Sequence, residues 1–318
     1  MTKPLVTVLM PAYNARRYIK QAVESVLGQT FRDFELLVYD DASTDDTREI
    51  LRGFAGRDDR VRLVEAEKSG YSTLLARGVD EAHGKYIARM DADDVCLPER
   101  LALQVARLQA EPGLVAVGGE ALQTDGDGWA IKPWGVPLDH EEIDRLHIGG
   151  LPGRLVHPAT TFRTETLREV GYRPEFEPAE DYDLYLRLAE VGQLANVPEI
   201  VLRYRWHLMN VSVTRHAEQW DALVRAYEAA RVRRGLEPVR LKPWSPVDLN
   251  RRRQSFVRSA AKHGHYATAA KHLLAFAATP STWGDALDLA YGSLRRAVGF
   301  GPRAVRRAGP AADAKGTT

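Results

Sequence analysis

The chain has 318 residues, of which 44% are hydrophobic, so it can bury one large core or two smaller ones and is not a disordered protein. Its single cysteine, Cys96, excludes an intramolecular disulfide framework, and residues 1–10 lack the basic start and long apolar run of a signal peptide. No uninterrupted run of about 18 apolar residues occurs, which argues against a membrane-spanning helix, and we expect a cytoplasmic protein.

The formal net charge of +1 is unevenly distributed. Residues 249–309 contain eleven Lys and Arg residues against Asp285 and Asp288, so this region carries +9 and the remainder −8. A basic region on an acidic body suggests an anionic partner. Peripheral contact with the inner face of an anionic membrane is one interpretation, and a solvated tail is the other, because glycine and proline interrupt the apolar and basic pattern over 293–307. Without an aromatic-basic platform, we expect no nucleic-acid partner.

Apolar periodicity alternates between strand and helix through the first third of the chain. The pattern predicts strands over 5–10, 34–39, 61–65, 86–90 and 114–118, and helices over 19–27, 44–54, 72–82 and 98–111. Such alternation predicts an α/β fold with a mostly parallel sheet and helices on both faces. Ligands of these sheets bind beyond the carboxyl ends of the strands.

The signals are less regular in the rest of the chain. Residues 120–150 look irregular, and we expect a surface loop there, with an insertion on the acceptor side as the alternative. Later segments predict a strand over 155–162, a helix from Asp181, extended structure over 194–204, and helices over 219–234 and 251–276. We therefore expect an α/β domain over 1–214, a helical C-terminal appendage over 215–308 and a disordered tail over 309–318.

Three acidic side chains, those of Asp91, Asp93 and Asp94, follow the strand expected at 86–90. Carboxylates this close repel one another unless protons or a metal ion neutralise them, and hard oxygen ligands suit Mg²⁺ or Mn²⁺. A metal-bound nucleotide is one hypothesis for this cluster. A solvated turn after a strand is the other, because an isolated Asp-x-Asp is weak evidence.

Six motifs in this order and spacing, over about residues 5–210, make the chain resemble the family 2 inverting glycosyltransferases, whose nucleotide-binding core is the GT-A fold. They are Val8–Asn14, Ser25–Thr30, Val38–Asp45, Asp91–Asp94, Glu180–Asp183 and Tyr204–His207. The resemblance implies a UDP- or dTDP-sugar donor, a glycan, lipid-linked or small-molecule acceptor, and Mg²⁺ or Mn²⁺. One departure is Ala76, where relatives often carry an Asn that could help to hold the nucleotide.

The resemblance also implies roles for the residues that bind the donor. Asp41 would accept the imide N–H of a uracil or thymine ring, although helix capping is the alternative. Pro11 and Tyr13 would line the base pocket. Asp93 would bind the metal. Asp91 would contact the ribose or, within the metal site, a metal-bound water. Asp94 would have a supporting or capping role and would point elsewhere if strand geometry persisted.

Two histidines and an arginine come later in the chain. His207 is a candidate metal ligand or diphosphate contact, because a neutral imidazole binds the same divalent ions; a surface histidine is the alternative. Arg205 is a further candidate for nucleotide contact. His157 could form a wall of the acceptor site.

Asp181 is the expected catalytic base, because an inverting transfer needs one carboxylate that deprotonates the acceptor hydroxyl. The alternative is an acidic residue that only stabilises the first turn of its helix. The helix dipole would lower its pKa and neighbouring carboxylates would raise it, so the sequence leaves the direction open. A non-catalytic nucleotide-sugar-binding protein is a second hypothesis. A sugar nucleotidyltransferase is a third, although Pro11 to Asn14 is not a glycine-rich phosphate loop.

Overall fold

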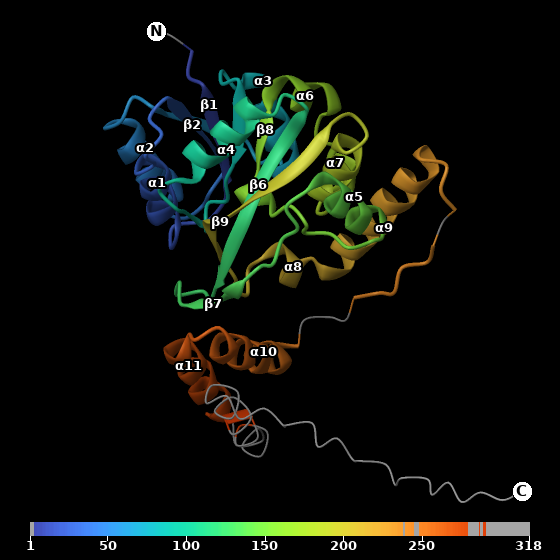
Figure 1. Cartoon of the computed structure of the whole chain (residues 1–318). Helices are drawn as coiled ribbons and strands as arrows, with labels where there is room; N and C mark the ends of the chain where they lie inside the picture. Colours follow the sequence, from blue (N-terminus) through green and yellow to red (C-terminus); the bar gives the residue numbers. More distant parts are fainter. Residues whose placement is uncertain (1–2, 238, 245–247, 279–285, 287–288, 291–318) are drawn as a thin grey trace, which may run out of the picture. The chain divides into compact units, whose positions relative to one another are not determined.

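The structure is a computed structural model that describes residues 3–237, 239–244, 248–278, 286 and 289–290 (Figure 1). The chain forms two compact units, Met1–Asp248 and Leu249–Thr318. Each unit is described by itself below.

A mixed sheet forms the centre of the first unit. In the described part of the chain it has nine strands, in the order β3-β2-β1-β4-β8-β6-β9-β5, with β7 paired to β6. The strands are β1 (Val6–Ala12), β2 (Phe34–Asp41), β3 (Val61–Ala66), β4 (Tyr86–Arg89), β5 (Val95–Cys96), β6 (Leu114–Thr124), β7 (Ala130–Pro133), β8 (Thr161–Arg163) and β9 (Gln193–Arg205).

Helices cover both faces of this sheet, as the alternating sequence pattern predicts. On one face lie α1 (Ile19–Leu27), α2 (Thr47–Ala55) and α4 (Arg100–Ala110), and on the other α3 (Tyr71–Glu81), α5 (His140–Ile148), α6 (Thr164–Val170) and α7 (Glu180–Leu188). Strand β1 shows the alternation directly, because Val8 and Met10 belong to the first core and Leu9 to the second.

The parallel part of the sheet brings three polar loops together. Strand β1 pairs in parallel with β2 and β4, and Ala12 lies opposite Asp40 while Leu9 lies opposite Arg89. The carboxyl ends of these strands therefore share one edge, which is where parallel sheets bind ligands. Strand β8 differs from the rest of this region, because it runs antiparallel to both β4 and β6.

Several predicted boundaries are wrong in the middle of the chain. Residues 120–150 are not a loop, because β6 continues to Thr124 and is followed by β7 and α5. The strand predicted over 155–162 is reduced to β8, and a 3₁₀ turn occupies His157–Ala159, where Pro158 lacks the N–H that a ladder needs.

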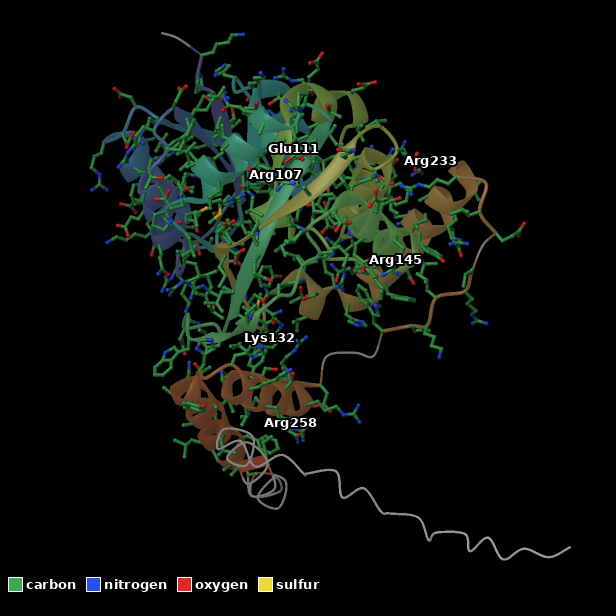
Figure 2. The ribbon with its side chains drawn as sticks, viewed as in Figure 1. Arg107, Glu111, Lys132, Arg145, Arg233 and Arg258 are labelled. Atoms are coloured by element: carbon green, nitrogen blue, oxygen red, sulfur yellow. The ribbon has the colours of Figure 1, made fainter. Side chains whose placement is uncertain are left out.

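After β9 the first unit ends with two helices, α8 (Val211–Thr214) and α9 (His216–Arg233). Helix α9 packs on α7 through a small core that includes Tyr182, Leu186, Leu223 and Tyr227. Surface helices carry ion pairs one turn apart, such as that of Arg107 on α4 with Glu111, the residue that follows the helix (Figure 2). The first helix expected beyond residue 214 therefore packs with the α/β unit.

The second unit contains α10 (Leu249–Lys262) and α11 (Tyr266–Ala277), which bury Val257 and Phe276 in a common core. The single helix predicted over 251–276 is wrong, because Gly264 adopts φ +81° between the two. The segment 293–307 and the predicted disordered tail 309–318 lie outside the described residues. In the described part of the chain no helix is long and apolar enough to cross a bilayer.

Candidate active site

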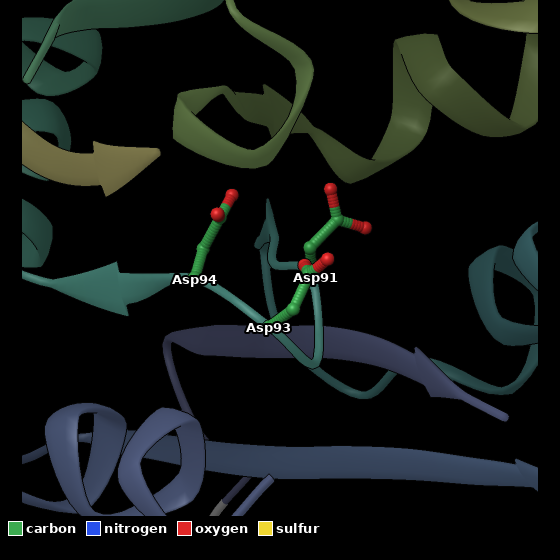
Figure 3. A group of neighbouring side chains, drawn as sticks. All are labelled: Asp91, Asp93 and Asp94. Atoms are coloured by element: carbon green, nitrogen blue, oxygen red, sulfur yellow. The ribbon is translucent and has the colours of Figure 1, made fainter. Parts of the chain in front are cut away.

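The acidic cluster occupies the turn between β4 and β5. Asp91, Asp93 and Asp94 each place a carboxylate oxygen within 4.8 Å of the others, and Figure 3 shows Asp91 and Asp94 projecting to the same side. Strand geometry ends at Arg89, so the alternation that would turn Asp94 away does not apply. Burial raises the pKa of Asp91 and raises that of Asp94 more strongly. The carboxylates of Asp93 and Asp91 add to the rise at Asp94.

This group of side chains fits a divalent cation. Oδ1 of Asp94 accepts the Arg205 N–H. Its Oδ2 is buried and has no hydrogen-bond partner among the described residues. A buried unpaired carboxylate oxygen beside two further carboxylates is costly unless a positive charge compensates it. Carboxylate oxygens with one imidazole are a donor set that Mg²⁺ or Mn²⁺ accepts.

His207 reaches the same turn from the end of β9. Its Nε2 lies 2.8 Å from Asp93 Oδ2, and its ring stacks on Tyr18 with centroids 5.1 Å apart. The Met209 N–H donates to Nδ1 at 3.2 Å, so Nε2 is the ring nitrogen that faces the acidic turn. The structure thus brings His207 and Asp93 together, as a shared metal site requires.

Arg205 supports the acidic turn from behind. Its Nε donates to Asp93 O at 2.8 Å, its Nη2 to Gln21 Oε1 at 2.8 Å and its Nη1 to Gly126 O at 3.2 Å. The guanidinium also lies 4.6 Å from the Tyr18 ring centroid. Every guanidinium nitrogen of this predicted nucleotide contact is therefore bonded to the protein.

Asp181 lies at the start of α7, where its Oδ1 accepts the Tyr182 N–H at 2.7 Å. The sequence leaves open whether the pKa of Asp181 is raised or lowered, and in the structure burial raises it. The Tyr182 N–H and Arg89 oppose this rise, and Asp91 adds to it. Burial and the neighbouring Asp181 raise the pKa of Glu180 to about 8. Burial thus raises the pKa of both carboxyl groups at the start of α7, Glu180 and Asp181.

Sequence reasoning missed Arg89, the last residue of β4. Its Nη2 forms a 2.6 Å ion pair with Asp91 Oδ1, and its guanidinium lies 5.3 Å from the Tyr71 ring centroid. Only 4% of the residue is exposed. The signal was present in the sequence as a cation next to three acidic residues, but a strand-end arginine is more often solvated.

The predicted base pocket lies at the ends of β1 and β2. Asp41 caps no helix: its Oδ1 accepts the Ser69 N–H at 2.8 Å and its Oδ2 pairs with Lys68 Nζ at 2.7 Å. Lys68 Nζ also lies 3.1 Å from the ring centroid of the exposed Tyr13. Pro11 is buried in β1. Nothing in the sequence indicated that Lys68 would pair with Asp41.

Two other residues that the sequence analysis singled out, His157 and Ala76, pack against the core. His157 is buried, bonds the Tyr172 hydroxyl through Nε2 at 2.8 Å and packs on Tyr185, so it lies in an aromatic cluster rather than on an open wall. Burial keeps its pKa well below the ordinary value. Ala76 packs against the core on the α3 face of the sheet.

The sequence was compared with known protein families and with known proteins. The sequence matches the family described as glycosyl transferase family 2 over residues 7–170, a region that includes Asp41 and the acidic turn and ends before Asp181. A putative teichuronic acid biosynthesis glycosyltransferase, TuaG from Bacillus subtilis, is 29% identical over 225 residues, which are 69% of this chain and 84% of TuaG.

Solved structures share the fold. The Staphylococcus aureus protein TarS (residues 1–349, with UDP-GlcNAc) has a TM-score of 0.57 at 15% identity, over 92% of this chain and 81% of TarS. The mannosyltransferase PcManGT from Pyrobaculum calidifontis, with GDP-Man and Mn²⁺, has a TM-score of 0.54 at 22% identity, over 93% and 81%. The expected GT-A fold is thereby confirmed, and the chain belongs to glycosyl transferase family 2.

Proposed function

We propose that this glycosyltransferase moves a sugar from a UDP- or dTDP-sugar to an acceptor hydroxyl with inversion of the anomeric configuration, in a metal-dependent reaction. The observation that supports this most strongly is the position of Asp181. Burial and Asp91 of the acidic turn raise the pKa of Asp181 while Arg89 opposes the rise, which supports a carboxylate near the acidic turn that can act as the base. An inverting transfer needs one such base opposite the leaving group.

The reaction then needs one displacement. An Asp181 carboxylate oxygen accepts the proton of the acceptor hydroxyl while the acceptor oxygen bonds to the anomeric carbon. The bond from that carbon to the diphosphate oxygen breaks, and its electron pair stays on the leaving nucleoside diphosphate. The transition state resembles an oxocarbenium ion, as is general in glycosidic chemistry. No covalent intermediate between sugar and protein forms.

Each of the other site residues would bind or position the donor. Asp93, Asp91 and His207 would hold a Mg²⁺ or Mn²⁺ ion, with Asp94 close enough to add its free oxygen. When bound, the metal offsets negative charge on the departing diphosphate. Asp41 would accept the imide N–H of the base, and Tyr13, half exposed at the rim, would stack on it.

Asp181→Asn tests the assignment against a protein that binds nucleotide sugars without transferring them. The variant should lose release of UDP from a UDP-sugar by about 100-fold or more while binding UDP and Mn²⁺ as the parent does. The exposed Asp59→Asn, outside the site, is the matched control and should match the parent. Transfer at the parent rate by Asp181→Asn contradicts the assignment, and no release by the parent with any donor favours the non-catalytic protein.

The acceptor is proposed from chemistry and from relatives. TuaG is described as a putative teichuronic acid biosynthesis glycosyltransferase, which supports a glycan or lipid-linked acceptor for this chain. In residues 249–278 six Lys and Arg residues occur without any acidic residue, and Arg258 projects from α10 (Figure 2). A positive surface of this kind favours peripheral contact with anionic phospholipid. Co-sedimentation with vesicles that is equal with and without phosphatidylglycerol would contradict the contact.

A further inference from the structure

The ring of Tyr18, the residue before α1, lies against the two side chains that reach the acidic turn from the end of β9. It stacks on the His207 imidazole with 5.1 Å between the centroids and 17° between the ring planes. The Arg205 guanidinium lies 4.6 Å from the same Tyr18 centroid. Both contacts need the aromatic face of Tyr18 and not its hydroxyl.

The stacked ring restricts a motion that the hydrogen bonds of His207 leave open. Its Nε2 lies 2.8 Å from Asp93 Oδ2, and its Nδ1 accepts the Met209 N–H at 3.2 Å. The torsion that sets the plane of a histidine ring has a broad minimum, so two hydrogen bonds still allow the ring to tilt. A nearly parallel ring against one face opposes this tilt. Tyr18 therefore narrows the range of directions in which Nε2 can point.

Tyr18 is itself held by the turn between β6 and β7. A Cβ placed on Gly126 would lie 3.5 Å from His207 Cβ and 3.7 Å from the Tyr18 hydroxyl oxygen, so the backbone of this turn packs against both residues. Beside Tyr18, Arg17 forms a 2.6 Å ion pair with Asp127 of the same turn. Contacts from the loop after β1, the β6–β7 turn and the end of β9 thus fix the two rings together.

We propose that Tyr18 is a positioning residue of the metal site: its ring holds the His207 imidazole in the orientation in which Nε2 faces Asp93. The inference rests on the proposed role of His207 in holding Mg²⁺ or Mn²⁺. It goes beyond that role because it names the group that orients this ligand. Loss of a residue that orients a metal ligand commonly lowers metal affinity by about 10- to 100-fold. A stacked ring restrains less than a hydrogen bond does, so we expect an effect of about tenfold.

The test is the Kd for UDP, measured by calorimetry with and without saturating Mn²⁺. Tyr18→Leu removes the aromatic face, so its Kd with Mn²⁺ should rise about tenfold while its Kd without Mn²⁺ equals the parent's. Tyr18→Phe keeps the face and should match the parent in both. Parent values in Tyr18→Leu would overturn the proposal. An equal loss in Tyr18→Phe would also overturn it, because the hydroxyl would then be the group that matters.

Phe54→Leu is the matched control. Phe54 on α2 is also partly buried, and its ring centroid lies 5.6 Å from the Arg57 guanidinium, outside the site. Both of its Kd values for UDP should equal the parent's. Tyr18→Met, which also lacks a ring, replaces Tyr18→Leu if that variant does not fold, and the same results are expected of it.

A double-mutant cycle with His207→Ala separates this inference from the proposed function. If Tyr18 acts through His207, adding Tyr18→Leu to His207→Ala should not raise the Kd for UDP with Mn²⁺ any further. A further tenfold rise would overturn the proposal, because Tyr18 would then act without the imidazole. A loss in His207→Ala without a loss in Tyr18→Leu overturns this inference alone. If Mn²⁺ strengthens neither UDP nor dTDP binding by the parent, the proposed metal-dependent function is wrong and the inference falls with it.

Discussion

Lys68 occupies the place where the proposed function puts a uracil or thymine ring. Its ammonium pairs with Asp41 Oδ2 at 2.7 Å and lies 3.1 Å from the Tyr13 ring centroid. A base that donates its imide N–H to Asp41 must replace Lys68 at Oδ2, while the Ser69 N–H can still donate to Oδ1. Binding of the base therefore competes with Lys68.

The cost of this competition follows from the exposure of the two partners. The Lys68 side chain is 54% exposed and the Asp41 side chain 6%, so the ion pair contributes no more than about 1 kcal/mol after solvent screening. The contact with Tyr13 adds about 0.5–1 kcal/mol at an exposed site. Displacing Lys68 thus costs about 1–2 kcal/mol, which equals about a 5- to 30-fold change in Kd.

Lys68→Met should therefore tighten UDP binding by about 5- to 30-fold, measured by titration calorimetry with Mn²⁺. Lys85→Met is the matched control, because Lys85 lies 5.7 Å from the Tyr86 ring centroid and outside the site. Its Kd for UDP should equal the parent's. Weaker UDP binding by Lys68→Met would refute the reasoning and show that Lys68 holds the nucleotide; an unchanged Kd would show that the base does not read Asp41.

Three further predictions concern support, charge and packing. In Arg205→Lys the shorter ammonium cannot reach the three acceptors of the guanidinium. The free energy of unfolding in urea should fall by about 3 kcal/mol, and the affinity for Mn²⁺ should fall as well. Parent values of both quantities would contradict the role of Arg205 behind the turn. Glu180 has its folded pKa raised to about 8, so its contribution to stability is complete below about pH 4 and is lost as the pH rises through 8. Glu180→Gln should then flatten the pH dependence of the melting temperature over this range, and an unchanged slope would speak against the raised pKa. Gly78→Ala places a Cβ against Leu9 Cδ1 in a filled core and should destabilise by about 1–3 kcal/mol, whereas a gain in stability would mean that Leu9 rotates freely.

Much of the parallel part of the fold could be predicted, because apolar residues there follow the periods of strand and helix. The pattern fails over 120–150 for a physical reason. Strand β6 contains Gly118 and Gly119, which offer no side chain to the pattern but let β9 approach closely: a Cβ at Gly118 would collide with the Asn196 amide. Close packing of this kind depends on residues almost eighty positions away.

The site shows the same division. The order of the family motifs, rather than any one residue, led us to expect the acidic turn, Asp181 and His207 in one region. They could not predict the pairing of cations with carboxylates. Arg89 and Lys68 read as solvated side chains in sequence, and their positions depend on contacts that only the folded chain provides. Nor could the motifs predict that the guanidinium of Arg205, a candidate for nucleotide contact, binds Asp93 O and Gln21.

Metal-dependent binding of the donor nucleotide is the central claim, and calorimetry with UDP, dTDP and GDP tests it most directly. Each nucleotide is titrated with and without Mn²⁺ into the parent protein and into Asp93→Asn. We expect UDP or dTDP to bind the parent about tenfold or more tightly when Mn²⁺ is present, and Asp93→Asn to lose this gain. Equal affinity with and without Mn²⁺ in the parent, for every nucleotide, would contradict the claim.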